Sequence, residues 1–170
     1  AHRMMGDATL IAVAAKKAQI VVVASAMTKV TDSLIQATDS ALRGARRESL
    51  QLIAGILDRH EEALRILAPD GGPAAETAQS EIQQIIEELR ELMGATVLLG
   101  ELTARTRDRV IASGEKMSVR LLSLALAQQG LSGVAMDADT FLETDDNFGE
   151  ANPLGVVADR TIRAALLPHL

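Results

Sequence analysis

The sequence predicts an α/β domain with more helix than strand, and three features support this prediction. Residues 20–24 (Ile-Val-Val-Val-Ala) form a β-branched run without alternation, which is typical of a strand buried on both faces of a parallel sheet. A helix that ends near Leu42 follows this run, which makes a strand–loop–helix unit. Residues 117–127 carry apolar side chains on almost every face, as a buried helix does. Residues 133–137 are the second predicted strand, and a right-handed crossover would place it beside the first.

The composition excludes several classes of site and partner. The chain of 170 residues is one domain or part of one, and its net charge of −6, without a basic run or an aromatic platform, argues against a nucleic-acid partner. With no cysteine, the chain has no disulfide, thiolate metal site or cysteine nucleophile. Its three histidines are too scattered for a metal site. We place the protein in the cytoplasm. No apolar run approaches the ~20 residues of a membrane span, so we expect no membrane segment.

Amphipathic patterns predict further helices around the two strands. The first helix spans residues 7–18 and the last spans residues 156–167. Two longer helices are predicted at residues 45–67 and 75–93, and the breaker Pro-Asp-Gly-Gly-Pro separates them. Their apolar stripes and short connection predict an antiparallel helical pair over residues 45–93. Such a pair usually packs on its own domain, and the less common alternative is an arm that binds a partner helix.

A short helix is predicted to begin after Thr103, whose hydroxyl can cap its first turn. Three arginines lie beside Asp108 in this helix: Arg105, Arg107 and Arg109. Such a cluster either binds phosphate or, more often, forms a solvated face with local ion pairs.

Residues 111–118 are predicted to form a loop that opens the buried helix. Ser113 could cap the first turn of this helix, and Gly114 allows other groups to approach the backbone closely. Glu115 would then lie at the positive end of the helix dipole, where a carboxylate stays ionised. Glu115 could bind an ammonium group there, or it could merely complement the dipole.

Two hydroxyl side chains, Ser25 and Thr31, follow the first predicted strand. Ligands of open α/β sheets collect at the carboxyl ends of the strands, so these hydroxyls are candidate site residues. The alternatives are an ordinary helix N-cap for Thr31 and a turn hydroxyl for Ser25.

Four short motifs resemble blocks of the aspartate kinases and occur in the order of that family. Residues 25–32 match S-A-M-x-x-x-T-D. Residues 102–108 and 113–118 look like the next block, which ends in G-E-[KRL]-[ML]-S. Residues 137–141 and 144–151 match the stretch after it, which reads D-A-x-x-F and then T-D-D-x-F-G-x-A. Each motif alone is weak, but the ordered set extends over residues 6–167 and is specific.

The resemblance implies a partial amino-acid kinase fold, in which a mostly parallel sheet lies between two layers of helices. It also implies transfer of the γ-phosphoryl group of ATP, with Mg²⁺, to the side-chain carboxylate of L-aspartate. This is the first step toward lysine, threonine and methionine. The matching positions imply that Ser25 and Thr31 line the aspartate site and that Glu115 contacts the α-amino group of the substrate. Phe148 lies in a segment that passes near the substrate in the family.

The sequence also departs from the family pattern. The family's K-F-G-G-T-S motif, whose lysine stabilises the transferred phosphoryl group, is absent, as are the G-R-G-G-S-D motif and the nucleotide site. We therefore expect residues 1–170 to be a truncated kinase domain that keeps the aspartate-binding lobe, without catalytic, cofactor-binding or metal-binding residues of its own. We expect this chain to be inactive alone and to form a homo-oligomer. The alternative is a non-catalytic helical interaction or regulatory module derived from the same lobe.

Overall fold

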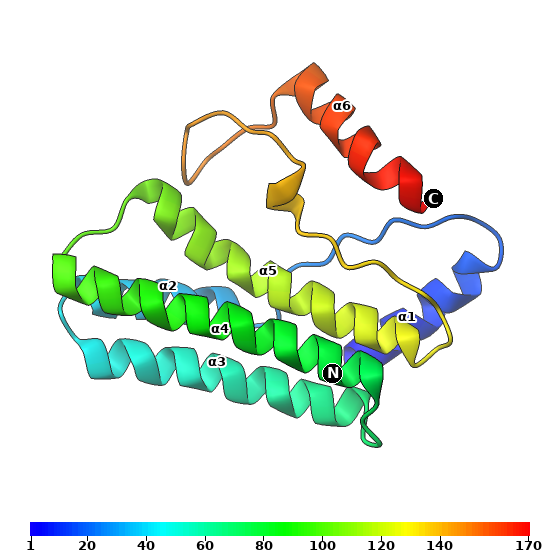
Figure 1. Cartoon of the computed structure of the whole chain (residues 1–170), viewed down its shortest axis with the longest axis horizontal. Coiled ribbons are helices and arrows are strands. Elements are labelled where there is room, and N and C mark those ends of the chain that lie inside the picture. The colour runs from blue at the N-terminus through cyan, green and yellow to red at the C-terminus, as the bar shows by residue number, and fades with distance from the viewer.

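The computed structural model describes residues 1–170 and contains helices but no β-strand. The α-helices are, in chain order (Figure 1), α1 (His2–Ala15), α2 (Val30–Leu42), α3 (Arg46–Leu67), α4 (Pro73–Leu99), α5 (Ala104–Ala127) and α6 (Gly155–Leu166). Two short 3-10 helices, η1 (Ala138–Thr140) and η2 (Leu167–His169), precede and follow α6. The one β-type pairing is an isolated antiparallel bridge between Thr144 and Pro153. The predicted α/β fold, with a three-layer arrangement around a parallel sheet, is therefore wrong.

Both predicted strands lie in irregular connections between helices. No residue of 19–25 or 132–136 takes part in a backbone–backbone hydrogen bond. Val23 is 93% exposed, so the valine run is not buried on both faces. A β-branched run fits a pleated surface well, but a strand forms only where a second strand supplies the ladder of hydrogen bonds. The sequence pattern shows that the side chains suit a strand, but it does not show whether a partner strand is present.

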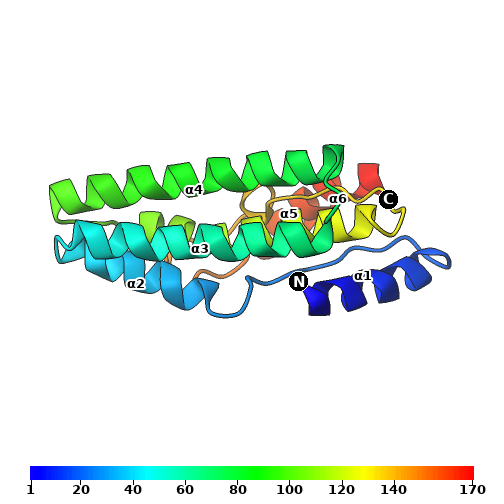
Figure 2. The ribbon, with the colours of Figure 1, turned by 90° about the horizontal axis from the view of Figure 1, so that it is seen from below.

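Helices α2, α3, α4 and α5 pack together as a bundle, and α1 lies against α5 and α3 (Figures 1 and 2). Helix α5 contacts each of the helices α1 to α4. The core between them is aliphatic, as the near absence of aromatic residues requires. Its largest fully buried apolar side chains come from four helices: Val30, Leu34, Ile53, Ile56, Ile82, Ile86, Leu89, Met93, Met117, Leu121 and Leu124.

The predicted helical pair is confirmed as α3 and α4, which pack against each other within the bundle. Helix α4 begins with Pro73 at its first position and continues to Leu99, so the predicted helix of residues 75–93 was too short. Gly100 ends it in the left-handed conformation, with φ at 71°, where glycine carries no steric penalty. Buried Ile53 and Ile82 show that the apolar stripes face the core of the chain itself.

Helix α5 is one continuous helix where the sequence predicted two. The Thr103 hydroxyl accepts a hydrogen bond from the Thr106 amide at 3.1 Å, so the predicted N-cap is confirmed. The predicted loop at residues 111–118 is wrong, because these residues lie inside the helix. Ser113 does not cap a helix, and its hydroxyl donates to the Arg109 carbonyl at 3.2 Å. A glycine at position 114 suggested a break, but glycine within a helix costs only about 1 kcal/mol relative to alanine.

At Gly114, the backbone of α5 lies close to side chains at and just before the start of α2. A Cβ atom at this position would lie 2.9 Å from Ala26 Cβ and 3.3 Å from Val30 Cγ1. These distances are shorter than ordinary van der Waals contact, so a larger residue would push the two segments apart. The prediction that Gly114 allows close approach to the backbone is confirmed.

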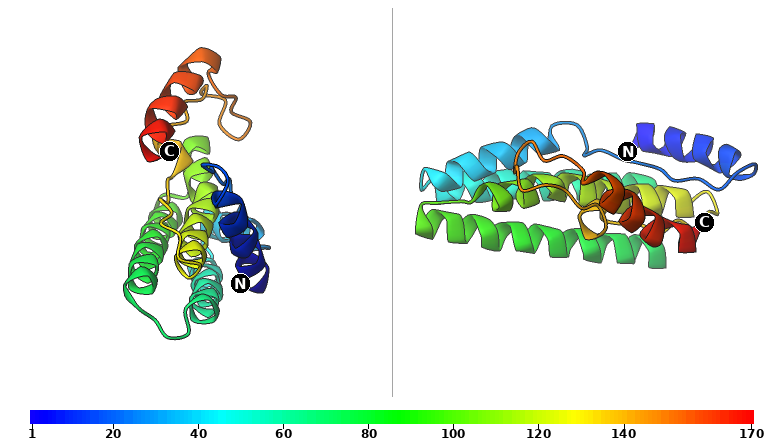
Figure 3. Two further views of the ribbon diagram at one scale, coloured as in Figure 1. Left: turned by 90° about the vertical axis from the view of Figure 1, so that its right-hand side faces the viewer. Right: turned by 90° about the horizontal axis from the view of Figure 1, so that it is seen from above.

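Helix α6 stands apart from the bundle, as two perpendicular views show (Figures 1 and 3). It contacts η2 and none of the helices α1 to α5. The residue range of α6 agrees with the amphipathic helix predicted for residues 156–167. None of the helices combines the length and the apolar character that crossing a membrane requires.

The bundle core contains one buried imidazole, that of His60 in α3, which is 0% exposed. Its Nδ1 donates to the Ile56 carbonyl at 2.7 Å, while Nε2 has no hydrogen-bond partner. Burial lowers the pKa of His60 below its ordinary value, and the positive charge of Arg59 lowers it further. The ring is therefore neutral in the folded chain at neutral pH.

His60 should make the stability of the chain depend on pH. As the pH falls below about 6.5, the unfolded chain binds a proton at His60 and the folded chain does not, so the free energy of unfolding decreases. His60→Leu should reduce this decrease between about pH 8 and about pH 5.5, measured by urea unfolding. The same substitution at exposed His169 is the control. An unchanged pH dependence in His60→Leu would contradict the prediction.

Gly114→Ala should destabilise the bundle, because its Cβ would overlap with Ala26. Overpacking of this kind costs about 1–3 kcal/mol, which outweighs the gain in helix propensity. Gly94→Ala in α4 is the matched control, since a Cβ there meets nothing within 4 Å and should be neutral or stabilising. Urea unfolding, followed by the circular dichroism of the helices, measures the free energy of unfolding of both variants. Equal effects of the two substitutions would show that the contact at Gly114 is not tight.

Candidate functional site

Glu115 lies in the middle of α5 and faces the connection between α1 and α2. The Ala26 amide donates a hydrogen bond to Glu115 Oε1 at 3.2 Å. The Ser25 hydroxyl donates to the same oxygen at 3.5 Å, the outer limit for a hydrogen bond. Ser25 and Glu115 are 90 residues apart in the sequence. The structure thus brings together two of the predicted site residues.

The electrostatic environment of Glu115 differs from the predicted one. Glu115 lies three turns from the start of α5, and the dipole of a helix acts mainly within its first turn, so the predicted stabilisation by the dipole is wrong. Donors from the facing segment hold the carboxylate instead. Both donate to Oε1, while Oε2 has no hydrogen-bond partner within the chain. A carboxylate fixed in this way has one oxygen available for a cation or an ammonium group.

Thr31 lies in the first turn of α2, half-buried beside Val30. Its neighbour Val30 packs against Gly114, so Thr31 is close in the chain to the contact between α2 and α5. No hydrogen bond joins Thr31 to Glu115. The alternative reading of Thr31 as an N-cap is wrong, because Lys29 occupies that position with φ at 67°.

Phe148 lies in the loop of residues 144–153, which is fastened to the N-terminal half of α5. The Arg105 guanidinium carbon lies 5.9 Å from the centre of the Phe148 ring, a cation–π distance. The Gly149 amide donates to Asp108 Oδ2 at 2.7 Å. Phe148 thus lies beside the N-terminal half of α5, the helix that carries Glu115, and no hydrogen bond joins the two residues.

Asp145 gives this loop its shape. Its carboxylate accepts hydrogen bonds from the backbone amides of Asn152 at 3.1 Å and Asn147 at 3.2 Å. A third hydrogen bond comes from the Asn152 side chain at 3.3 Å. These donors hold the pKa of Asp145 below its ordinary value, because they favour the charged form. An ionised Asp145 therefore closes the loop on itself, and the loop presents Phe148 and Gly149 to α5.

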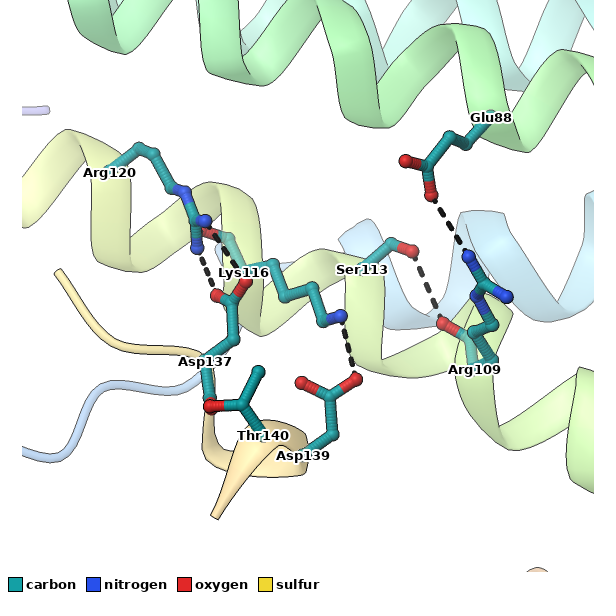
Figure 4. A network of polar contacts seen from close by, with 8 residues as sticks. All are labelled: Glu88, Arg109, Ser113, Lys116, Arg120, Asp137, Asp139 and Thr140. Carbon is teal, nitrogen blue, oxygen red and sulfur yellow. Dashed lines mark hydrogen bonds and ion pairs between the residues drawn. The ribbon is translucent and has the colours of Figure 1, made fainter. Parts of the chain in front are cut away.

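The three arginines near the start of α5 do not form a phosphate site. Arg107 pairs with Asp39 of α2 at 3.4 Å. Arg109 pairs with Glu88 of α4 at 3.3 Å (Figure 4). Arg105 lies over Phe148. Because the three side chains go to three different partners, the alternative of a face with local ion pairs agrees better with the structure.

Farther along α5, a second set of ion pairs holds the connection between α5 and η1 (Figure 4). Arg120 is 15% exposed and binds Asp137 with two nitrogens, and it also pairs with Glu81 at 3.1 Å. The hydrogen bonds that Arg120 donates to the Asp137 carboxylate raise the pKa of Arg120. Lys116 pairs with Asp139 at 2.7 Å. Sequence analysis did not predict these ion pairs. A usable signal was present, because Lys116 and Arg120 are four residues apart and Asp137 and Asp139 are two residues apart.

The sequence reasoning also missed the contact between Asp108 and Gly149. Both residues lie within the motifs that resemble the aspartate kinases, but they are 41 residues apart. No local pattern connects a helical carboxylate with a distant backbone amide, so only the fold could show this pair.

Comparison with known proteins reveals several aspartokinases among the relatives of this chain. The chain is 32% identical over 113 residues to an aspartokinase of Schizosaccharomyces pombe, which covers 66% of this chain. It is 33% identical over 130 residues to the chloroplastic aspartokinase 2 of Arabidopsis thaliana, covering 74% of this chain. It is 31% identical over 150 residues to the chloroplastic aspartokinase 1 of the same plant, covering 86%. No family model matches the chain.

The similarity covers most of this chain but a smaller share of the relatives. The chain spans 22% to 25% of the length of these three aspartokinases. These relatives are aspartokinases, the kind of protein that the ordered motifs of the sequence resemble. Over most of its residues, this chain is therefore an aspartokinase-related polypeptide.

Proposed function

We propose that this chain forms the aspartate-binding part of an aspartate kinase. The names of the relatives support a kinase function at the family level. The reaction of the larger protein would transfer the γ-phosphoryl group of ATP to the side-chain carboxylate of L-aspartate, giving 4-phospho-L-aspartate. In this chain, Glu115 would bind the α-ammonium group of the substrate, and Ser25 and Thr31 would lie beside it.

The geometry of Glu115 is the observation that carries this proposal. Ala26 and Ser25 fix one carboxylate oxygen, so the side chain loses little further freedom when a ligand binds. The second oxygen has no partner within the chain and can accept a charge-assisted hydrogen bond from an ammonium group. The site is half-buried, which strengthens such a contact relative to one in free water.

The residues of this chain do not fit MgATP. Arg107 and Arg109 are engaged by carboxylates, and no group of three or more histidine or acidic side chains is arranged to hold a metal ion. Phosphoryl transfer depends on cations around the phosphates. We therefore assign no step of the transfer itself to residues of this chain.

A second candidate function is a non-catalytic helical interaction or regulatory module. The observation that favours it is the all-helical bundle, which stands without the sheet that an amino-acid kinase fold would require. Titration with L-aspartate separates the two candidates, because a module without a substrate role has no reason to bind this amino acid selectively.

Glu115→Gln should weaken binding of L-aspartate to the purified chain by about tenfold or more, because a charged partner of the ammonium group is lost. Glutamine keeps an oxygen that can accept from Ala26, so the local structure should survive. Isothermal titration calorimetry measures the affinity, and exposed Glu91→Gln in α4 is the matched control.

Succinate provides a second control, because it has both carboxylates of aspartate and no ammonium group. Its affinity should be the same for the unchanged chain and for Glu115→Gln. Equal losses for succinate and L-aspartate would show that Glu115 does not contact the ammonium group. Unchanged affinity for L-aspartate would contradict the assignment altogether.

A further inference from the structure

Asp108 makes a contact that the proposed binding of the ammonium group does not use. Its Oδ2 accepts the Gly149 amide at 2.7 Å, a short distance that is typical of a charged acceptor. Asp108 takes part in no ion pair, although arginines flank it at two positions, because Arg107 and Arg109 pair with other helices. The Asp108 carboxylate therefore interacts with the loop of residues 144–153 and with no cationic side chain.

Gly149 turns the loop so that its amide faces α5. Its φ is 91°, in the region that favours glycine, and it directly follows Phe148. The Phe148 ring is held at the same time by the Arg105 guanidinium at 5.9 Å. The Phe148–Gly149 corner is therefore attached to α5 at two points one turn apart.

Helix geometry places this corner on the same side of α5 as Glu115. Asp108 and Glu115 are seven residues apart, which is close to two full turns, so their side chains leave the helix in nearly the same direction. Their separation along the axis is about 10 Å at a rise of 1.5 Å per residue.

We propose that Asp108 is a positioning residue for L-aspartate, which fixes the Phe148–Gly149 corner as the wall opposite Glu115. This inference rests on the proposed function, in which Glu115 holds the ammonium group. The side-chain carboxylate of the substrate would then point toward the Phe148–Gly149 corner.

The two phenylalanines of the chain allow a direct test by fluorine NMR. The chain carries Phe141 and Phe148 alone, so 4-fluorophenylalanine labelling of Phe141→Leu leaves Phe148 as the single probe. L-Aspartate should shift the Phe148 resonance. Asp108→Ala should abolish this shift at the same ligand concentration and raise the dissociation constant about tenfold.

Two matched variants separate positioning from general damage to the fold. Asp108→Asn keeps an acceptor for the Gly149 amide and should restore the shift and most of the affinity. Asp58→Ala removes an exposed acid of α3 that has no partner, and it should bind like the unchanged chain. Amide exchange at Gly149 should be about tenfold faster in Asp108→Ala than in Asp108→Asn.

The outcomes distinguish this inference from the proposed function. Calorimetric binding of L-aspartate with an unmoved Phe148 resonance would overturn the inference and leave the proposed function intact. If Asp108→Ala binds L-aspartate with unchanged affinity and shows the full shift of the Phe148 resonance, the inference is also overturned and the proposed function stands. If the unchanged chain does not bind L-aspartate in calorimetry, the proposed function fails and the positioning role fails with it.

Discussion

The close contact between α5 and the start of α2 at Gly114 is the constraint on which the candidate site depends. Because Gly114 has no side chain, Ala26 and Val30 reach the helix backbone at distances that a Cβ atom would not allow. This approach brings the Ala26 amide and the Ser25 hydroxyl to Glu115, the next residue of the helix. The carboxylate is thereby oriented by packing rather than by the helix dipole. A packed aliphatic contact holds such a geometry well, since interiors have few voids and resist displacement.

Helix α5 organises the polar contacts as well as the core. One end of the helix holds the loop that contains Phe148, through Asp108 and Arg105. The C-terminal half of the helix holds the connection that follows it, through Lys116 and Arg120. The exposed ion pairs of α5 contribute little stability, because solvent screens them and the long side chains lose entropy. Arg120 differs, because it is largely buried and binds Asp137 with two nitrogens, so removal of Asp137 would leave its charge poorly compensated.

The two segments that were predicted to be strands form irregular connections between the helices of the bundle. Residues 20–24 and 133–137 have the composition of buried strands, yet the backbone groups of residues 20–24 and 133–136 bond to no other backbone group of this chain. The first connection still has a defined role, because it ends in the residues that contact Glu115. The motif that begins at Ser25 therefore serves the site in a helical setting, without depending on the predicted edge of a sheet.

The sequence by itself determined the elements whose cause is local. Apolar stripes located α3 and α4, Thr103 marked the start of α5, and the ordered motifs pointed to the family before any comparison. The tertiary structure decided what depends on distant partners: that the valine run forms no strand, that α5 continues through Gly114, and that Ser25 meets Glu115 across 90 residues. The physical reason is the range of the interactions. Helical hydrogen bonds join residues four apart, whereas strand pairing and side-chain contacts between helices require partners that only the folded chain brings together.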